Sequence, residues 1–118
     1  MHVPSQPSQI RRMIDSRLKR VAADRPLLAV SLALVHKRCG QPSCGCHHGG
    51  PAHPAHHLTY KEGGKTRTVY VPHDLLDEVQ AWVSEYQRLK NLLGEISQLT
   101  LALVRHHVQD RRRRRGRP

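Results

Sequence analysis

The sequence predicts an α+β fold in which two helices flank a small antiparallel β-sheet. An apolar stripe with helical spacing lies near the N-terminus, two β-rich runs surround a Gly-Gly pair, and a second helical stripe continues after them. A chain of 118 residues suffices for one domain. We therefore expect a single domain over residues 9–104, between a disordered leader at 1–8 and a disordered arginine-rich tail at 108–118.

The first helix is predicted over residues 9–24. Apolar residues recur there at spacings of three and four, which forms one stripe along the helix, and Ser8 is a suitable N-cap. A strand is predicted at 28–37, because LAVSLALVHK alternates between two sets of side chains with the period of a β-strand. A helix over the same span is an alternative, since Leu and Ala also favour helices.

A β-hairpin is predicted over residues 56–71. Gly63 and Gly64 stand between two β-rich runs, and a tight two-residue turn requires positive φ at both central positions. The register that this turn imposes places Leu58 opposite Val69.

A long amphipathic helix is predicted over residues 74–107, with Asp74 as its cap. Its apolar residues are separated by alternating steps of four and three, which is a heptad seam, and Leu92 and Leu99 widen the seam on its flanks. The seam can pack within the monomer, or it can dock on a second copy of the chain or on a larger protein. The predicted interaction positions are Leu75, Val79, Trp82, Tyr86, Leu89, Leu93 and Ile96.

The charge of the chain favours a polyanionic partner. Twenty Lys and Arg against nine Asp and Glu give a net charge of +11. The segment from Arg105 onward holds seven arginines and one acid, and it alone carries +6. Clustered arginines bind phosphates without reading base sequence, so we expect nucleic acid, and DNA in particular, as the partner. The predicted contacts are Lys61, Lys65 and Arg67 on the hairpin and Arg111, Arg112, Arg113, Arg114 and Arg115 in the tail.

The loop at residues 39–55 holds the residue types that carry chemistry. It contains all three cysteines of the chain, Cys39, Cys44 and Cys46, and five histidines lie within or just after it. Three thiolates and one imidazole satisfy the tetrahedral shell of a structural Zn²⁺ ion. The alternative is three reduced thiols in a turn-rich loop, because the paired C-x-x-C spacing of a zinc ribbon is absent.

Disulfide bonding, membrane insertion and catalysis are each disfavoured. An odd number of cysteines leaves one thiol over, and the sequence shows neither a secretion signal nor an apolar run of about 18 residues. These features predict a cytoplasmic, reducing location. The loop at 39–55 also contains no Asp or Glu that could orient a histidine base, so we expect a protein that is not an enzyme.

Four features follow one another along the chain: Ser31-Leu32, KRCGQPSCGC, LTYKEGGKTRTVYVP and the long leucine-rich helix. In this order they resemble an uncharacterised bacterial family, domain of unknown function 6788, whose genes often lie near transposases. The resemblance implies a small domain in a DNA-associated or mobile-element context. Family members carry a His-Gly-Pro-Tyr step after the cysteines, and because His53 stands in that place here, we expect it to be the fourth metal ligand.

Overall fold

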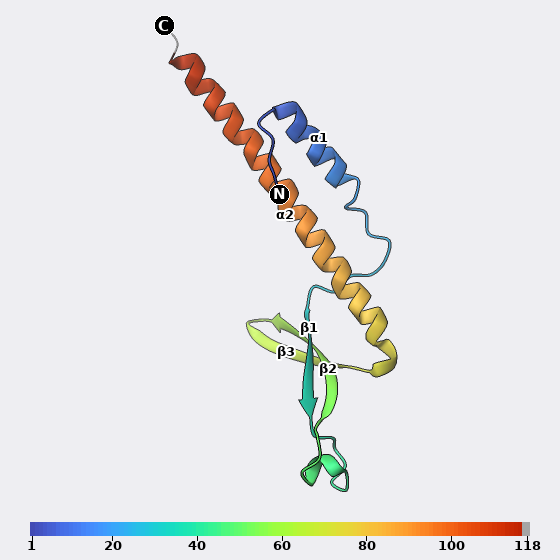
Figure 1. The fold of residues 1–118 in the computed structure, drawn as a ribbon. Coiled ribbons are helices and arrows are strands. Elements are labelled where there is room, and N and C mark those ends of the chain that lie inside the picture. Colours follow the sequence, from blue (N-terminus) through green and yellow to red (C-terminus); the bar gives the residue numbers. More distant parts are fainter. Residues whose placement is uncertain (117–118) are drawn as a thin grey trace. The chain divides into compact units, whose positions relative to one another are not determined.

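The computed structural model describes residues 1–116 and confirms the α+β fold class (Figure 1). A helix precedes a three-stranded antiparallel sheet, and a long helix follows it. None of the helices in this part of the chain is long and apolar enough to cross a membrane. The main elements are α1 (Pro7–Leu18), β1 (Ser31–Lys37), β2 (His53–Glu62), β3 (Lys65–Val71) and α2 (Leu76–Arg115).

The described chain divides into two compact units, each with buried side chains of its own, whereas the sequence predicts one domain. The helical unit comprises residues 1–24 and the residues from Gln87 onward; the sheet unit comprises residues 25–86. A helix of 40 residues such as α2 is about 60 Å long, which exceeds what one small core can cover. The buried apolar residues are Ile10, Leu92 and Leu99 in the helical unit and Cys46, Val71 and Val79 in the sheet unit.

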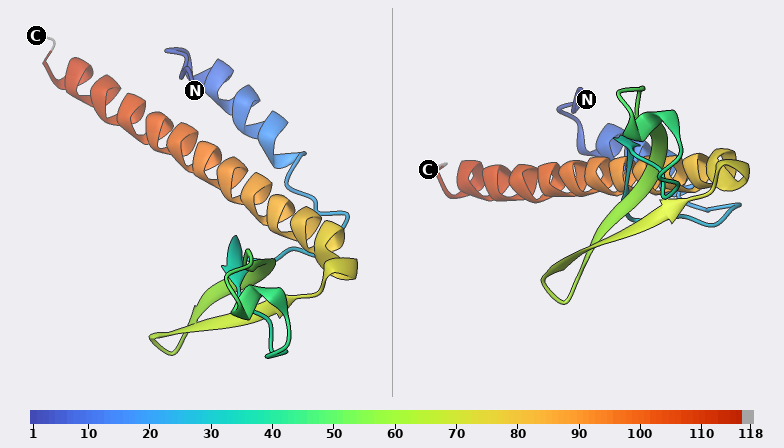
Figure 2. Two further views of the ribbon diagram at one scale, coloured as in Figure 1. Left: turned by 60° about the horizontal axis from the view of Figure 1, so that its bottom comes forward. Right: turned by 90° about the horizontal axis from the view of Figure 1, so that it is seen from below.

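In the helical unit, α1 lies antiparallel to the second half of α2 (Figures 1 and 2). Two arginines join the helices beside the apolar contacts. Nε of Arg17 donates to Oε2 of Glu95 at 2.7 Å, and this ion pair is partly shielded from solvent. Arg88 of α2 donates to the backbone carbonyls of Arg20 and Ala22, at 2.6 and 3.3 Å. These bonds hold both the last turn of α1 and the segment that leaves it.

The bounds of α1 differ from the predicted 9–24. Pro7 occupies the first helical turn, where its fixed φ suits a helix and its missing N–H is not needed, so α1 begins before Ser8. Ser8 is therefore inside the helix and is not its N-cap. The helix ends at Leu18. The carbonyls of Arg20 and Ala22, just beyond this end, accept hydrogen bonds from Arg88.

The three strands form one sheet in the order β1-β2-β3. Leu58 pairs with Val69, which confirms the predicted hairpin register. Gly63 and Gly64 adopt φ of 57° and 81°, so the turn uses a backbone conformation that side chains with a Cβ rarely adopt.

The first strand is shorter than the predicted 28–37 and begins at Ser31. The N–H of Leu28 donates to the carbonyl of Trp82 at 3.1 Å, so the chain before the strand is bonded to the first turns of α2. At Leu28 the apolar run therefore bonds to a helix and not to a neighbouring strand.

The Cys/His loop and the hairpin turn lie at opposite ends of β2, because one precedes this strand and the other follows it (Figure 1). β2 has ten residues, which corresponds to about 30 Å of extended chain. The loop and the basic hairpin are therefore separate features of the sheet unit.

At its C-terminal end α2 is longer than the predicted 74–107. Helix continues to Arg115, so the tail expected to be disordered at 108–118 is helical over most of its length, and its last two residues lie outside the described part. Arginine is a good helix former, and cations in the last turn interact favourably with the helix dipole. Asp110 also pairs with Arg114 one turn later, at 3.1 Å.

The heptad seam of α2 is buried unevenly. Leu92 and Leu99, on the predicted flank, are 3% and 0% exposed, whereas Leu93, in the predicted seam, is 57% exposed. The apolar core of the helical unit therefore lies on the Leu92 side of α2. Val79 is buried as expected. The half-buried seam residues are Leu75, Trp82, Tyr86, Leu89 and Ile96.

We predict that Leu99→Ala lowers the free energy of unfolding by about 2–5 kcal/mol, because it removes a fully buried side chain and leaves a cavity. Leu93→Ala is the matched control and should cost less than about 0.5 kcal/mol, since Leu93 is mostly exposed. Denaturant unfolding followed by far-UV circular dichroism measures both. Equal losses from the two variants would contradict this packing of α2.

Candidate metal centre

The four predicted metal ligands come together in the loop between β1 and β2. The ligand atoms of Cys39, Cys44, Cys46 and His53 all lie within 4.8 Å of one another. The sheet explains this proximity, because Lys37 at the end of β1 pairs with His53 at the start of β2. The two ends of the loop are thereby held side by side.

The distances within this Cys3His cluster suit a tetrahedral site. Sγ of Cys39 lies 3.6 Å from Sγ of Cys46, and Sγ of Cys44 lies 3.2 Å from Nε2 of His53. Sulfurs bound to one metal ion at about 2.3 Å would stand roughly 3.8 Å apart in a tetrahedron. The backbone N–H of Cys39 also donates to Sγ of Cys46 at 3.4 Å, which would stabilise a thiolate there. The cluster is therefore compatible with a bound metal ion.

Local hydrogen bonds and burial shift the pKa values of two of the thiols in opposite directions. The pKa of Cys44 is lowered to about 6, chiefly by the backbone N–H of Cys46 and then by the side chain of His53. Burial raises the pKa of Cys46, which is 3% exposed. The thiolate is the form that binds metal, and a lowered pKa keeps Cys44 in this form at neutral pH.

Two further histidines stabilise the loop without belonging to the cluster. Nε2 of His47 bonds to the carbonyl of Cys39 at 2.6 Å, and Nε2 of His48 bonds to the carbonyl of Pro42 at 3.1 Å. Since a Cys3His site needs only one imidazole, the sequence leads us to expect that the other four histidines of residues 39–57 are surplus and exposed. His47 and His48 are exposed, but they have a structural role that only the loop conformation reveals. The prediction is wrong for His57, which is buried in β2.

Glycine is required where the loop closes on itself. The N–H of Gly50 donates to the carbonyl of Gly45 at 2.8 Å. A Cβ on Gly50 would lie 2.6 Å from the same oxygen, which is closer than a side chain allows. This tight return brings the chain after the cysteines back toward β2.

We predict one metal ion per chain in protein that is purified without a histidine tag. Cys44→Ser should abolish binding, because it removes a thiolate from a four-ligand site. His53→Gln should weaken it. Elemental analysis by mass spectrometry after dialysis gives the stoichiometry.

The matched control for the imidazole is His48→Gln, which changes a histidine of the same loop whose ring bonds to a carbonyl and not to a thiol. It should retain the metal. Wild-type protein without metal, or equal loss in the two histidine variants, would contradict a Cys3His site.

The three hairpin cations do not form one surface. In the observed register Arg67 lies opposite Tyr60, and Lys65 lies opposite Glu62, on one face of the sheet. Lys61 pairs with Thr66 and points to the other face, because alternate residues of a strand face opposite sides. Because Lys65 faces Glu62 and the three cations are divided between two faces of the sheet, the hairpin is a weak phosphate-binding surface.

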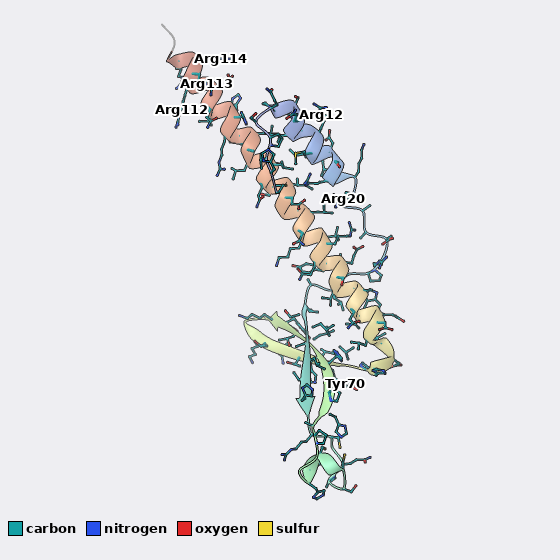
Figure 3. The ribbon with its side chains drawn as sticks, in the orientation of Figure 1. Arg12, Arg20, Tyr70, Arg112, Arg113 and Arg114 are labelled. Atoms are coloured by element: carbon teal, nitrogen blue, oxygen red, sulfur yellow. The ribbon has the colours of Figure 1, made fainter. Side chains whose placement is uncertain are left out.

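The arginine run at 111–115 lies in the exposed last turns of α2. Successive helical residues are rotated by about 100°, so five in a row surround the helix with cations. Figure 3 shows Arg112, Arg113 and Arg114 pointing away from the helix in different directions. The ion pair between Arg114 and Asp110 is exposed and contributes little to stability.

The positive charge is concentrated in the helical unit. This unit contains fourteen of the twenty Lys and Arg residues and four of the nine Asp and Glu residues, for a formal charge of +10. The sheet unit contains six and five, for a charge of +1. The metal site and the basic surface are thus properties of different units.

These features define a small α+β protein with a Cys3His cluster and a basic pair of helices. Residues 8–81 match the model of a family described as a domain of unknown function (DUF6788), and the chain belongs to this family. The match includes α1 apart from its first residue, the sheet and the whole Cys3His cluster, and it ends before the arginine run. No curated protein and no solved structure matches the chain. The transposase neighbourhood that the resemblance implies stays a prediction.

Proposed function

We propose that the protein is a small nucleic-acid-binding accessory protein whose Cys/His loop is held by a structural zinc ion. The observation that carries the proposal is the charge of +10 on the helical unit, which includes five consecutive exposed arginines in the last turns of α2. Such a surface attracts a polyanion and gains free energy by releasing the counterions of its phosphates.

Zinc is the metal that the cluster fits best. Three sulfurs and one imidazole nitrogen are the soft and borderline donors that Zn²⁺ prefers. Four protein ligands also complete a tetrahedral shell and leave no position for a substrate, so the role is structural. The ion would hold Cys39, Cys44 and Cys46 against His53 and so stabilise a loop that has few buried apolar residues.

The arginine run supports binding without base specificity. Cations on all sides of a helix can contact phosphates from either strand, whereas base reading requires side chains in a defined orientation within a groove. DNA is the expected partner, and the mobile-element context implied by the family resemblance suits an accessory role beside a DNA-processing enzyme.

We predict that the protein binds a labelled DNA duplex with an affinity that falls steeply as salt increases. Replacing Arg111, Arg112, Arg113, Arg114 and Arg115 with glutamine should reduce affinity at least about tenfold and flatten the salt slope, by about 0.9 for each phosphate that is no longer neutralised. Replacing the same five residues with lysine is the control and should retain most of the affinity. Fluorescence anisotropy at several salt concentrations measures both effects.

The hairpin is compared in the same assay. Replacing Lys61, Lys65 and Arg67 with glutamine should have a smaller effect, because these cations lie on two faces and Lys65 faces Glu62. Binding no tighter than that of an unrelated basic protein, or an unchanged affinity without the five arginines, would refute the proposed function.

A second candidate function is self-association through α2. Four large apolar residues of the helical unit, Leu93, Leu101, Val104 and Val108, are 41–57% exposed. Their spacings of eight, three and four residues place them on one side of the helix, which we call the outer stripe. A second copy of the chain in antiparallel orientation could cover this stripe while keeping the two arginine runs apart.

If the outer stripe is a dimer interface, light scattering should give twice the chain mass of 13.5 kDa. Leu101→Ser, in the stripe, should then produce a monomer, because it would place a polar hydroxyl group in an apolar interface. Gln98→Ser, an exposed change on another side of the helix, should not. A strict monomer for the wild-type chain at high concentration would exclude this function.

A further inference from the structure

A groove of about 450 Å³ opens in the helical unit, between the first turns of α1 and the end of α2. Its walls are rich in basic and imidazole groups from both ends of the chain. The lining residues that matter here are Arg11 from α1 and His106, His107, Asp110 and Arg113 from α2.

We infer that this groove binds one unpaired nucleotide of a nucleic acid, with the phosphate on Arg11 and Arg113 and the base against His106 and His107. The inference rests on the proposed function and identifies the place where the strand is held. It goes beyond that function because it predicts a preference for single strands over duplex.

The phosphate position follows from the charges of the lining. Arg11 and Arg113 come from different helices and both line the groove, so we expect a phosphate bound there to accept hydrogen bonds from both guanidinium groups. The first turn of α1 contains no acid, and its positive dipole end favours an anion. The one acidic residue of the lining, Asp110, is already paired with Arg114 at 3.1 Å, which reduces its repulsion of a phosphate.

The position of the base follows from the volume of the groove and from the imidazole rings that line it. Pockets of about 300–1,000 Å³ hold ligands of the size of a nucleotide, and the groove of about 450 Å³ lies within this range. Imidazole rings stack on unpaired bases, and His106 and His107 are the aromatic groups of the lining. A strand that must place a base in the groove cannot keep it paired.

The test uses the full chain and fluorescence anisotropy with a labelled oligonucleotide, supplied single-stranded and as a duplex of the same sequence. Arg11→Gln combined with Arg113→Gln should reduce single-strand affinity at least about tenfold. The control combines Arg12→Gln with Arg112→Gln, which removes the same charge, one cation from α1 and one from the arginine run, from exposed positions outside the groove (Figure 3). It should reduce affinity less than about threefold, and lysine at positions 11 and 113 should restore most of the binding.

The second part of the test changes the two histidines of the groove. His106→Ala combined with His107→Ala should reduce single-strand affinity by about fivefold or more and change duplex affinity little, because only an unpaired base can stack on the rings. Inorganic phosphate and a mononucleotide are added as competitors, and the mononucleotide should displace the single strand at lower concentration than phosphate does.

The outcomes separate this inference from the proposed function. Equal losses in the groove and control variants, with binding by the wild-type chain intact, would refute the groove and leave general nucleic-acid binding standing. No binding of either oligonucleotide by the wild-type chain would refute the proposed function itself. Far-UV circular dichroism of each variant, compared with wild type, shows whether a loss arises from unfolding, and the lysine variants keep the test decisive if glutamine destabilises the helices.

Discussion

The central strand β2 is the constraint on which the sheet unit depends. It pairs with β1 along one edge and with β3 along the other, and its two ends lead into the Cys/His loop and the hairpin turn. Pairing of Lys37 with His53 holds the loop ends together, so the imidazole that begins β2 reaches the three thiols. A shift of one residue in this register would turn His53 to the other face and dismantle the cluster.

The helical unit has a different balance of forces. Few apolar side chains are fully buried there, and a formal charge of +10 favours expansion of the unit. The bonds of Arg17 to Glu95 and of Arg88 to two carbonyls oppose this repulsion by using cations to join the helices. A bound polyanion would relieve the same repulsion, so a nucleic acid that binds as proposed would stabilise the helical unit.

A structural metal ion would stabilise the sheet unit, as a bound polyanion would stabilise the helical unit. Small domains bury too little apolar surface to order long loops, and metal ligation supplies free energy that packing cannot. The loop contributes one buried residue, Cys46, and is otherwise held by hydrogen bonds from His47 and His48 and by the close return at Gly50. Binding of a metal at the cluster would therefore act on the part of the sheet unit with the least core.

Local patterns in the sequence determined the fold class, the hairpin with its register and the three cysteines of the cluster, because strand alternation, Gly-Gly turns and Cys spacing act over short distances. His53 is expected as the fourth ligand only from the family resemblance. Tertiary structure alone decided the rest. The chain that follows α1 is bonded to Arg88, and the chain that precedes β1 is bonded to Trp82, both distant in sequence. Arg11 and Arg113 line the same groove only because α1 and α2 lie antiparallel, and no local sequence pattern encodes this arrangement.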